Sequence, residues 1–86
     1  MPSYSVIVPA FNEERGLAAV LSELVRVCQD SEIVVVNDGS TDSTEQVARG
    51  FPVRVVNHPL NRGYGAALKT GIAHAKHELL VFVPQN

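Results

Sequence analysis

The sequence predicts an α/β protein built on a parallel β-sheet. Four short runs rich in valine and isoleucine alternate with three longer segments of helical periodicity, which is the order typical of parallel α/β sheets. The runs are residues 4–8, 32–36, 53–56 and 79–83. Three of them are nearly continuous in apolar residues, as expected where helices cover both faces of a sheet. We therefore expect one β-α-β-α-β-α-β unit.

The helical segments lie between these runs. In the first, residues 17–28, apolar side chains recur at spacings of three and four and form one stripe. The second is short and follows good N-cap residues at 40–42. The third, residues 64–75, carries small residues that allow close approach to the sheet. Right-handed crossovers then favour the strand order 3-2-1-4, counted along the chain.

Composition excludes several classes of protein. Apolar residues make up 45% of the chain and charged residues 19%, which is typical of a folded domain. A net charge of −2 without a basic block argues against nucleic acid as a partner. The lone Cys28 cannot form an intrachain disulfide, and the apolar stretch 6–11 is too short for a signal sequence or a membrane span. We expect a single soluble, cytoplasmic domain of marginal stability.

Ligands of parallel α/β sheets bind beyond the carboxyl ends of the strands, which selects the segments after Val8, Val36, Val56 and Val83. The first three of these segments are loops that could carry chemistry. The first loop begins with Pro9, Ala10 and Phe11 and continues to Glu13. Here the start of a helix would offer free backbone amides to an anion or a ribose oxygen. The alternative is a plain helix cap, with Asn12 as the cap residue. This loop alone does not distinguish the two.

The second loop begins with Asn37, Asp38 and Gly39. A carboxylate at the end of a strand can accept the imide N–H of uracil or pair with the edge of guanine, and a glycine lets backbone come close. Asp38 is therefore the best candidate for base recognition. The alternative is an Asp-Gly turn that caps the next helix without any ligand.

The third loop holds Arg62, Gly63, Gly65 and Lys69. Two glycines before a helix expose backbone N–H groups, and the two cations supply charge for a diphosphate or a base. The alternative is a tight turn with Gly65 packed close to the sheet. The glycine pair is only a fragment of a dinucleotide fingerprint and follows the wrong strand, so a nicotinamide or flavin cofactor is not expected.

No catalytic residue and no metal site is predicted. His58, His74 and His77 do not share metal-ligand spacing with the cysteine, so we expect them to be solvated side chains. No serine has a histidine and an acid in a recognisable arrangement, so the sequence does not support hydrolase chemistry.

Taken together, the three loops read VIVPAFNEE, VVNDGSTDST and NRGYGAALKTGI. In this order they strongly resemble the beginning of family 2 glycosyltransferases, most of all the branch that transfers mannose or glucose to polyprenol (dolichol) phosphate. The resemblance covers the chain up to Leu80. It implies the nucleotide-binding part of a Rossmann-like GT-A fold, a three-layer half domain with a mostly parallel sheet, and a pocket for a UDP- or GDP-linked sugar. The nucleotide-binding residues that it implies are Pro9, Ala10, Phe11, Glu13, Asp38, Gly39, Ser40, Arg62, Gly63 and Lys69.

The sequence departs from the family pattern after the fourth run. The family's Asp-X-Asp motif binds Mg²⁺ or Mn²⁺ across the diphosphate, whereas these positions hold Pro84, Gln85 and Asn86. We therefore expect weak or absent metal binding and one truncated donor-binding domain, residues 1–86, that is inactive alone. Whether the chain is an enzyme stays open, and the alternative is a non-catalytic, degenerate nucleotide-binding or interaction module. The exposed last strand would favour self-association.

Overall fold

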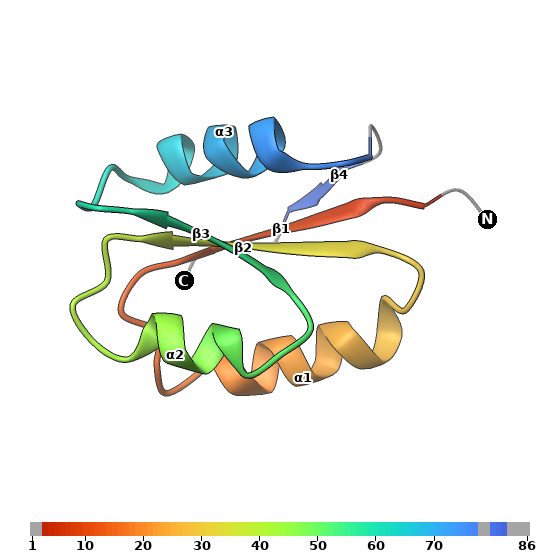
Figure 1. The fold of residues 1–86 in the computed structure, drawn as a ribbon, viewed down its shortest axis with the longest axis horizontal. Coiled ribbons are helices and arrows are strands. Elements are labelled where there is room, and N and C mark those ends of the chain that lie inside the picture. The colour runs from red at the N-terminus through yellow and green to blue at the C-terminus, as the bar shows by residue number, and fades with distance from the viewer. Residues whose placement is uncertain (1–2, 78–79, 83–86) are drawn as a thin grey trace.

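The structure is a computed structural model that describes residues 3–77 and 80–82 (Figure 1). Strands and helices alternate along the whole described chain. In order they are β1 (Ser5–Ala10), α1 (Leu17–Val27), β2 (Glu32–Asp38), α2 (Thr44–Arg49), β3 (Arg54–His58), α3 (Tyr64–His74) and β4 (Leu80–Phe82). The predicted α/β class is confirmed. Within the described ranges, no helix has the length and apolar character needed to cross a membrane.

The strands form one parallel sheet in the order β3-β2-β1-β4. The register places Ala10 beside Asn37 and Asn37 beside Asn57. The carboxyl ends of β1, β2 and β3 therefore lie at the same edge of the sheet, and so do the three loops that follow them. This edge is where the sequence predicts a binding site.

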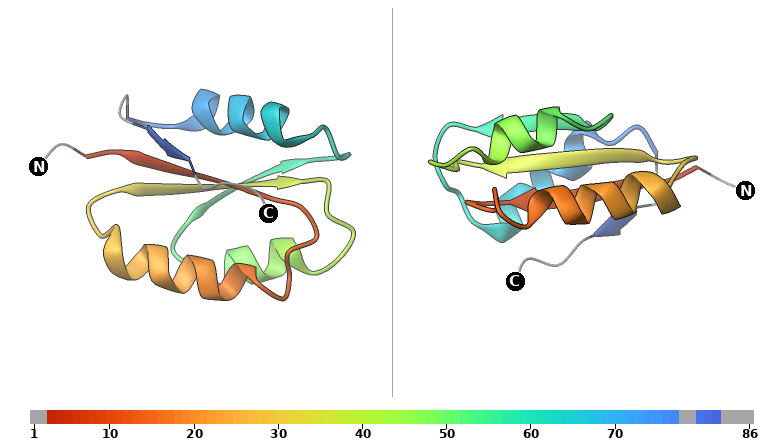
Figure 2. Two further views of the ribbon diagram at one scale, coloured as in Figure 1. Left: turned by 180° about the vertical axis from the view of Figure 1, so that it is seen from behind. Right: turned by 90° about the horizontal axis from the view of Figure 1, so that it is seen from below.

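Helices cover both faces of this sheet. Helices α1 and α2 lie side by side on one face and α3 lies on the other (Figures 1 and 2). All six residues of β1 are buried, because alternate side chains pack against the two helical layers. One core contains Val6, Val8, Leu17, Leu21, Ile33 and Val35, and the other contains Ile7, Val34, Val36 and Ala67. Two-sided burial explains why the strand runs are continuously apolar.

Strands β2 and β3 continue two residues beyond the apolar runs 32–36 and 53–56, as far as Asp38 and His58. The added residues are polar, yet the parallel pairing continues between them. Their side chains are hydrogen-bonded across the two strands, Asn37 to Asn57 at 2.9 Å and Asp38 to His58 at 2.7 Å. Because buried polar groups that are paired lose little stability, the sheet extends to the end of this polar segment.

Two glycines of α3 differ in their surroundings. At Gly71 an added Cβ would lie under 3.0 Å from Ile7 Cγ2, so the helix meets β1 there at the distance that only a glycine allows. At Gly65 no atom of the described residues lies within 4 Å of such a Cβ. The interpretation that packs Gly65 close to the sheet is therefore wrong, and Gly71 makes the close approach instead.

The opposite edge of the sheet is held together by Glu32. Its carboxylate accepts the Ser5 hydroxyl at 2.9 Å and the Lys76 amide at 2.8 Å, and Arg54 lies 3.9 Å away. Burial would raise the pKa of the Glu32 carboxyl, but these donors and cations outweigh it and lower the pKa. The ionised side chain therefore ties β1, β2 and β3 to the segment that follows α3.

Candidate functional site

The loops that follow β1 and β2 are hydrogen-bonded to each other. Ser40 Oγ accepts the Asn12 amide and Thr44 Oγ1 accepts the Glu13 amide, both at 2.9 Å. In return, Asn12 Oδ1 accepts the Thr41 amide at 2.8 Å. The amides that the sequence offers to an anion are therefore bound by Ser40 of the second loop and by Thr44, the first residue of α2. The prediction of free amides is wrong for Asn12 and Glu13.

The predicted cap is wrong for α1, whereas Asp42, one of the cap residues predicted for α2, accepts an amide at the start of that helix, although Ser43 occupies the N-cap position. Helix α1 has Gly16 as its N-cap without a side-chain cap hydrogen bond, whereas Asn12 has a φ of +49° and lies four residues earlier. In front of α2, the carboxylate of Asp42 accepts the Thr44 amide at 2.9 Å and the Glu14 amide at 3.3 Å. Hydrogen bonds from Thr44 are the main reason that the pKa of the Asp42 carboxyl is lowered.

Asp38 accepts four hydrogen bonds at the end of β2. Its Oδ1 accepts the Arg62 amide at 2.9 Å and lies 2.7 Å from His58 Nδ1. Its Oδ2 accepts the Gly63 amide at 2.9 Å and the side-chain amide of Asn61 at 3.2 Å. Burial alone would raise the pKa of the Asp38 carboxyl, but the bonds from His58, Arg62 and Gly63 outweigh it and lower the pKa.

The Asp38 carboxylate therefore binds the protein's own third loop. Its side chain is only 4% exposed, and its two oxygens already hold about as many donors as an ionised carboxylate accepts. A base could reach it only by displacing one of these donors. The hydrogen bonds support a role in holding the loop more than the predicted role in reading a base.

Gly39 and Gly63 have distinct surroundings in these loops. Gly39 has a φ of +72°, and a Cβ there would lie under 3.0 Å from the backbone of Leu60 and Asn61. The close approach expected at Gly39 is thus made by the third loop. Gly63 also has a positive φ of +98°, but within the part of the chain that the structure describes no atom lies within 4 Å of an added Cβ. The space beside Gly63, where a side chain would point, is therefore open.

His58 is buried, so the prediction that it is solvated is wrong. Its side chain is 5% exposed, and its Nε2 lies 2.7 Å from Oγ1 of Thr70 in α3. His74, in contrast, is exposed as predicted. His58 pairs with Asp38 in the strand register, which the spacing of the two strand runs alone does not determine. Once the strands are known to extend to these residues, His58 becomes the natural partner of the buried acid.

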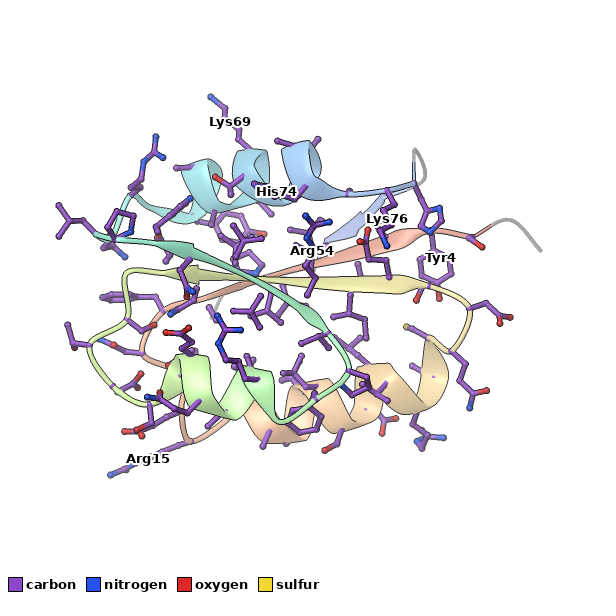
Figure 3. The ribbon with its side chains drawn as sticks, viewed as in Figure 1. Tyr4, Arg15, Arg54, Lys69, His74 and Lys76 are labelled. Carbon is purple, nitrogen blue, oxygen red and sulfur yellow. The ribbon has the colours of Figure 1, made fainter. Side chains whose placement is uncertain are left out.

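The other predicted site residues differ in how close they come to this edge. Pro9 and Ala10 are buried at the end of β1, Phe11 is half-buried just beyond it, and Arg62 is exposed in the third loop. Lys69 is exposed on α3 and points away from the sheet (Figure 3). Its direction does not support a contact with a ligand at the three loops.

A second series of hydrogen-bonded polar side chains lies at this edge, on the face of the sheet that α2 covers. The Asn37 amide group donates to Asn57 Oδ1 at 2.9 Å, and the Asn57 amide group donates to Glu45 at 3.1 Å. Among the described residues, Asn37 Oδ1 has no hydrogen-bond partner. These residues are absent from the sequence-based site, although their polar character directly after apolar runs is a visible signal.

Within residues 3–77 and 80–82, the structure has no side-chain group that fits a divalent metal. The described part of the chain holds no group of three His, Cys, Asp or Glu side chains that could bind a metal ion. Pro84, Gln85 and Asn86 lie outside the described residues, and none of them carries a carboxylate. Mg²⁺ and Mn²⁺ favour carboxylate and other oxygen ligands, which is why the absence of carboxylates at these three positions supports a prediction of weak metal binding.

A parallel α/β sheet with loops that meet at the carboxyl ends of its strands is typical of ligand-binding α/β proteins, and this protein has that arrangement. Comparison with known proteins then identifies the particular family. The sequence matches glycosyl transferase family 2 over residues 5–83. The chain belongs to this family.

Individual relatives agree with this assignment. A dolichyl-phosphate β-glucosyltransferase of Trichomonas vaginalis is 37% identical, in an alignment that covers 92% of this chain and 29% of that protein. The chain therefore spans less than a third of the length of this relative.

Solved structures have the same fold. S. aureus TarS is 30% identical with a TM-score of 0.84, over 96% of this chain and 16% of that one. Glucosyl-3-phosphoglycerate synthase from Mycobacterium tuberculosis, in complex with Mn²⁺, UDP and glucosyl-3-phosphoglycerate, is 34% identical with a TM-score of 0.79, over 95% of this chain and 33% of that one. These similarities place the chain among GT-A glycosyltransferases.

Proposed function

We propose that residues 1–86 form one domain that binds the donor nucleotide of a glycosyltransferase. The reaction would transfer a sugar from a UDP- or GDP-linked donor to an acceptor, for which polyprenyl phosphate is the candidate. Membership of the family supports this proposal, as do the dolichyl-phosphate relative and the neighbour solved with UDP. The observation that carries it is the meeting of three loops at the carboxyl edge, where they are hydrogen-bonded into one surface.

The nucleotide would lie across this surface. The space beside Gly63 is open, so a ligand could approach the backbone there. The N-terminus of α3, which follows Gly63, favours the negative charge of a diphosphate. The exposed guanidinium of Arg62 adds positive charge beside it. The proposed contacts are Pro9, Ala10, Phe11, Glu13, Gly39, Ser40, Arg62 and Gly63. Asp38 would support this surface indirectly, because its carboxylate binds the backbone amides of Arg62 and Gly63 in the third loop.

We propose further that these 86 residues do not transfer sugar by themselves. In the family reaction an acceptor oxygen displaces the nucleoside diphosphate at the anomeric carbon, and the departing negative charge needs stabilisation. The sequence 84–86 lacks the carboxylates of the Asp-X-Asp motif. We therefore predict that Mg²⁺ or Mn²⁺, which the family uses, binds weakly or not at all to these 86 residues. The cytoplasmic location and the absence of nucleic acid among the partners also stay predictions.

A second candidate function is a non-catalytic module. It is favoured by the hydrogen bonds that already satisfy Asp38 and the amides of Asn12 and Glu13 within the chain. A surface that completes its own hydrogen bonds needs no ligand to be stable. The two functions differ in whether a nucleotide binds at all.

Titration calorimetry with UDP, GDP and their sugars, with and without Mn²⁺, separates the two functions. We expect Arg62→Ala to weaken nucleotide binding about tenfold, because a charge-assisted contact is lost. Arg26→Ala is the matched control, since Arg26 is an exposed arginine in the last turn of α1, at the other end of the molecule. A chain that binds none of these nucleotides would refute the donor site and favour the module.

Two further measurements address activity and assembly. Transfer of a radiolabelled sugar by the 86-residue chain would contradict the proposed inactivity. Self-association through the last strand, residues 79–83, is expected to raise the mass seen by light scattering at micromolar concentration. A monomer at every concentration would count against it. Residues 79 and 83 lie outside the described part of the chain.

A further inference from the structure

A buried hydrogen-bond chain runs beneath the third loop. His58 Nδ1 lies 2.7 Å from Asp38 Oδ1, and His58 Nε2 lies 2.7 Å from Thr70 Oγ1. Asp38 and His58 are Cα partners in neighbouring strands, and their side chains are 4% and 5% exposed. Thr70 belongs to α3, which covers this face of the sheet. These hydrogen bonds therefore connect β2, β3 and α3 at the point where the third loop begins.

The acid determines which ring nitrogen carries hydrogen. An ionised carboxylate only accepts hydrogen bonds, so Nδ1 of His58 must donate to Asp38. In a neutral ring Nε2 then accepts the hydroxyl hydrogen of Thr70, and in a charged ring it donates to the hydroxyl oxygen. A ring with hydrogen on Nε2 alone would direct two lone pairs at each other. His58 is therefore a fixed donor to Asp38.

The same carboxylate binds the turn that opens α3. Asp38 Oδ1 is shared between the ring of His58 and the amide of Arg62, and Oδ2 accepts the amide of Gly63. Gly63 has a φ of +98°, so this turn has an unusual backbone conformation that the carboxylate helps to maintain. Because His58 occupies one side of Oδ1, it restricts rotation of the carboxylate and keeps Oδ2 directed at Gly63.

We propose that His58 is a positioning residue of the donor site. By donating to Asp38 it holds the turn of Arg62 and Gly63 in the conformation that meets the nucleotide. The side chain of His58 is buried, so its effect on the nucleotide would pass through Asp38. This inference rests on the proposed function, because the donor is what makes the conformation of the turn matter.

Two substitutions of His58 by amide side chains test the roles of Nδ1 and Nε2 separately. In His58→Asn the side-chain nitrogen can take the place of Nδ1 and keep the bond to Asp38, whereas in His58→Gln the longer side chain reaches the place of Nε2 near Thr70. Thr70→Val removes the Nε2 partner and leaves the acid bound, so it should behave as His58→Asn does.

The readouts are the amide resonances of Arg62 and Gly63 by NMR without nucleotide, followed by calorimetric titration with UDP and GDP. We expect His58→Gln to shift or broaden both resonances and to weaken nucleotide binding about tenfold, because a hydrogen bond to a charged group is lost. His58→Asn and Thr70→Val should leave both resonances close to those of the unmodified chain. Their dissociation constants should stay within about threefold of its value.

Equal effects of His58→Asn and His58→Gln, or a larger effect of His58→Asn, would overturn the proposal. Ring ¹⁵N spectra of the unmodified chain test it without any mutation: a ring that carries hydrogen only on Nε2 would also overturn it. If no nucleotide binds to the unmodified chain while the two amides still respond to His58→Gln, the donor site is refuted. The positioning of the turn by His58 then stands, so the two failures are distinguishable.

Discussion

Replacement of Gly71 by alanine tests the close contact between α3 and β1. The new Cβ would lie under 3.0 Å from Ile7 Cγ2 and 3.3 Å from Ile7 Cδ1, whereas unstrained carbon atoms stay about 3.5–4.0 Å apart. Ile7 is 0% exposed and lies in β1, which has a neighbouring strand on each side. Its side chain therefore has little space to move away, and the helix must shift instead.

The expected cost follows from two opposing effects. Overpacking a core costs about 1–3 kcal/mol, and a contact well under 3.0 Å against a fully buried side chain lies at the upper end of this range, at about 2–3 kcal/mol. The better helix propensity of alanine returns about 1 kcal/mol. We therefore expect Gly71→Ala to lower the free energy of unfolding by about 1–2 kcal/mol. In a domain of this size that corresponds to a fall in Tm of about 5–15 °C. Urea denaturation followed by circular dichroism measures the first quantity and thermal denaturation the second.

The chain offers a matched control and a rescue. Gly65→Ala places the same methyl group on the same helix where no atom of residues 3–77 or 80–82 lies within 4 Å, so stability should be unchanged or higher by up to about 1 kcal/mol. Ile7→Leu removes the Cγ2 methyl and should recover part of the stability that Gly71→Ala loses. Equal stability of the two alanine variants, or strictly additive effects of Gly71→Ala and Ile7→Leu, would refute the reasoning.

Three further predictions follow from named contacts. Gly39→Ala should cost about 2–4 kcal/mol, since it combines a positive φ with a clash against the backbone of Asn61, and an unchanged urea midpoint would contradict this. The folded-state pKa of Asp38 is lowered, so its stabilisation is complete above the ordinary pKa of 3.8 and is lost as pH falls through the lower value. Between pH 6 and pH 3 the urea midpoint should therefore fall less in Asp38→Asn than in the unmodified chain, and equal falls would argue against this role of Asp38. Arg49→Ala breaks an exposed pair with Glu45 and should cost at most about 0.5 kcal/mol by the same assay.

The strands and helices of this protein follow from local sequence patterns. The apolar runs, the helical stripe of residues 17–28 and the small residues of the third helix predict all elements near their observed positions. β1, β2 and β3 each end two residues beyond the predicted run, and in β2 and β3 the added residues, as far as Asp38 and His58, are polar. Hydrophobic periodicity carries no signal there, because the pairing of these residues depends on partners in another strand.

The loops at the edge of the sheet are also visible in the sequence, but their hydrogen bonds are not. Asp38 stands out as an acid after an apolar run, yet its partners Arg62 and Gly63 lie 24 and 25 residues further along the chain. The same holds for Ser40 and Thr44, which bind amides 28 and 31 residues away. A sequence-based reading leaves these groups available for a ligand, whereas the fold uses them to bind one loop to the next.

The sequence by itself therefore determined the class of fold, the order of its elements and the three loops that meet at one edge. These features depend on the spacing of apolar, glycine and capping residues within short segments. Only the tertiary structure decided that His58 is buried, that Asp38 holds the third loop and that Gly71 makes the close contact. Each of these depends on strand register and on the path of distant segments, because hydrogen bonds and steric contacts act between neighbours in space.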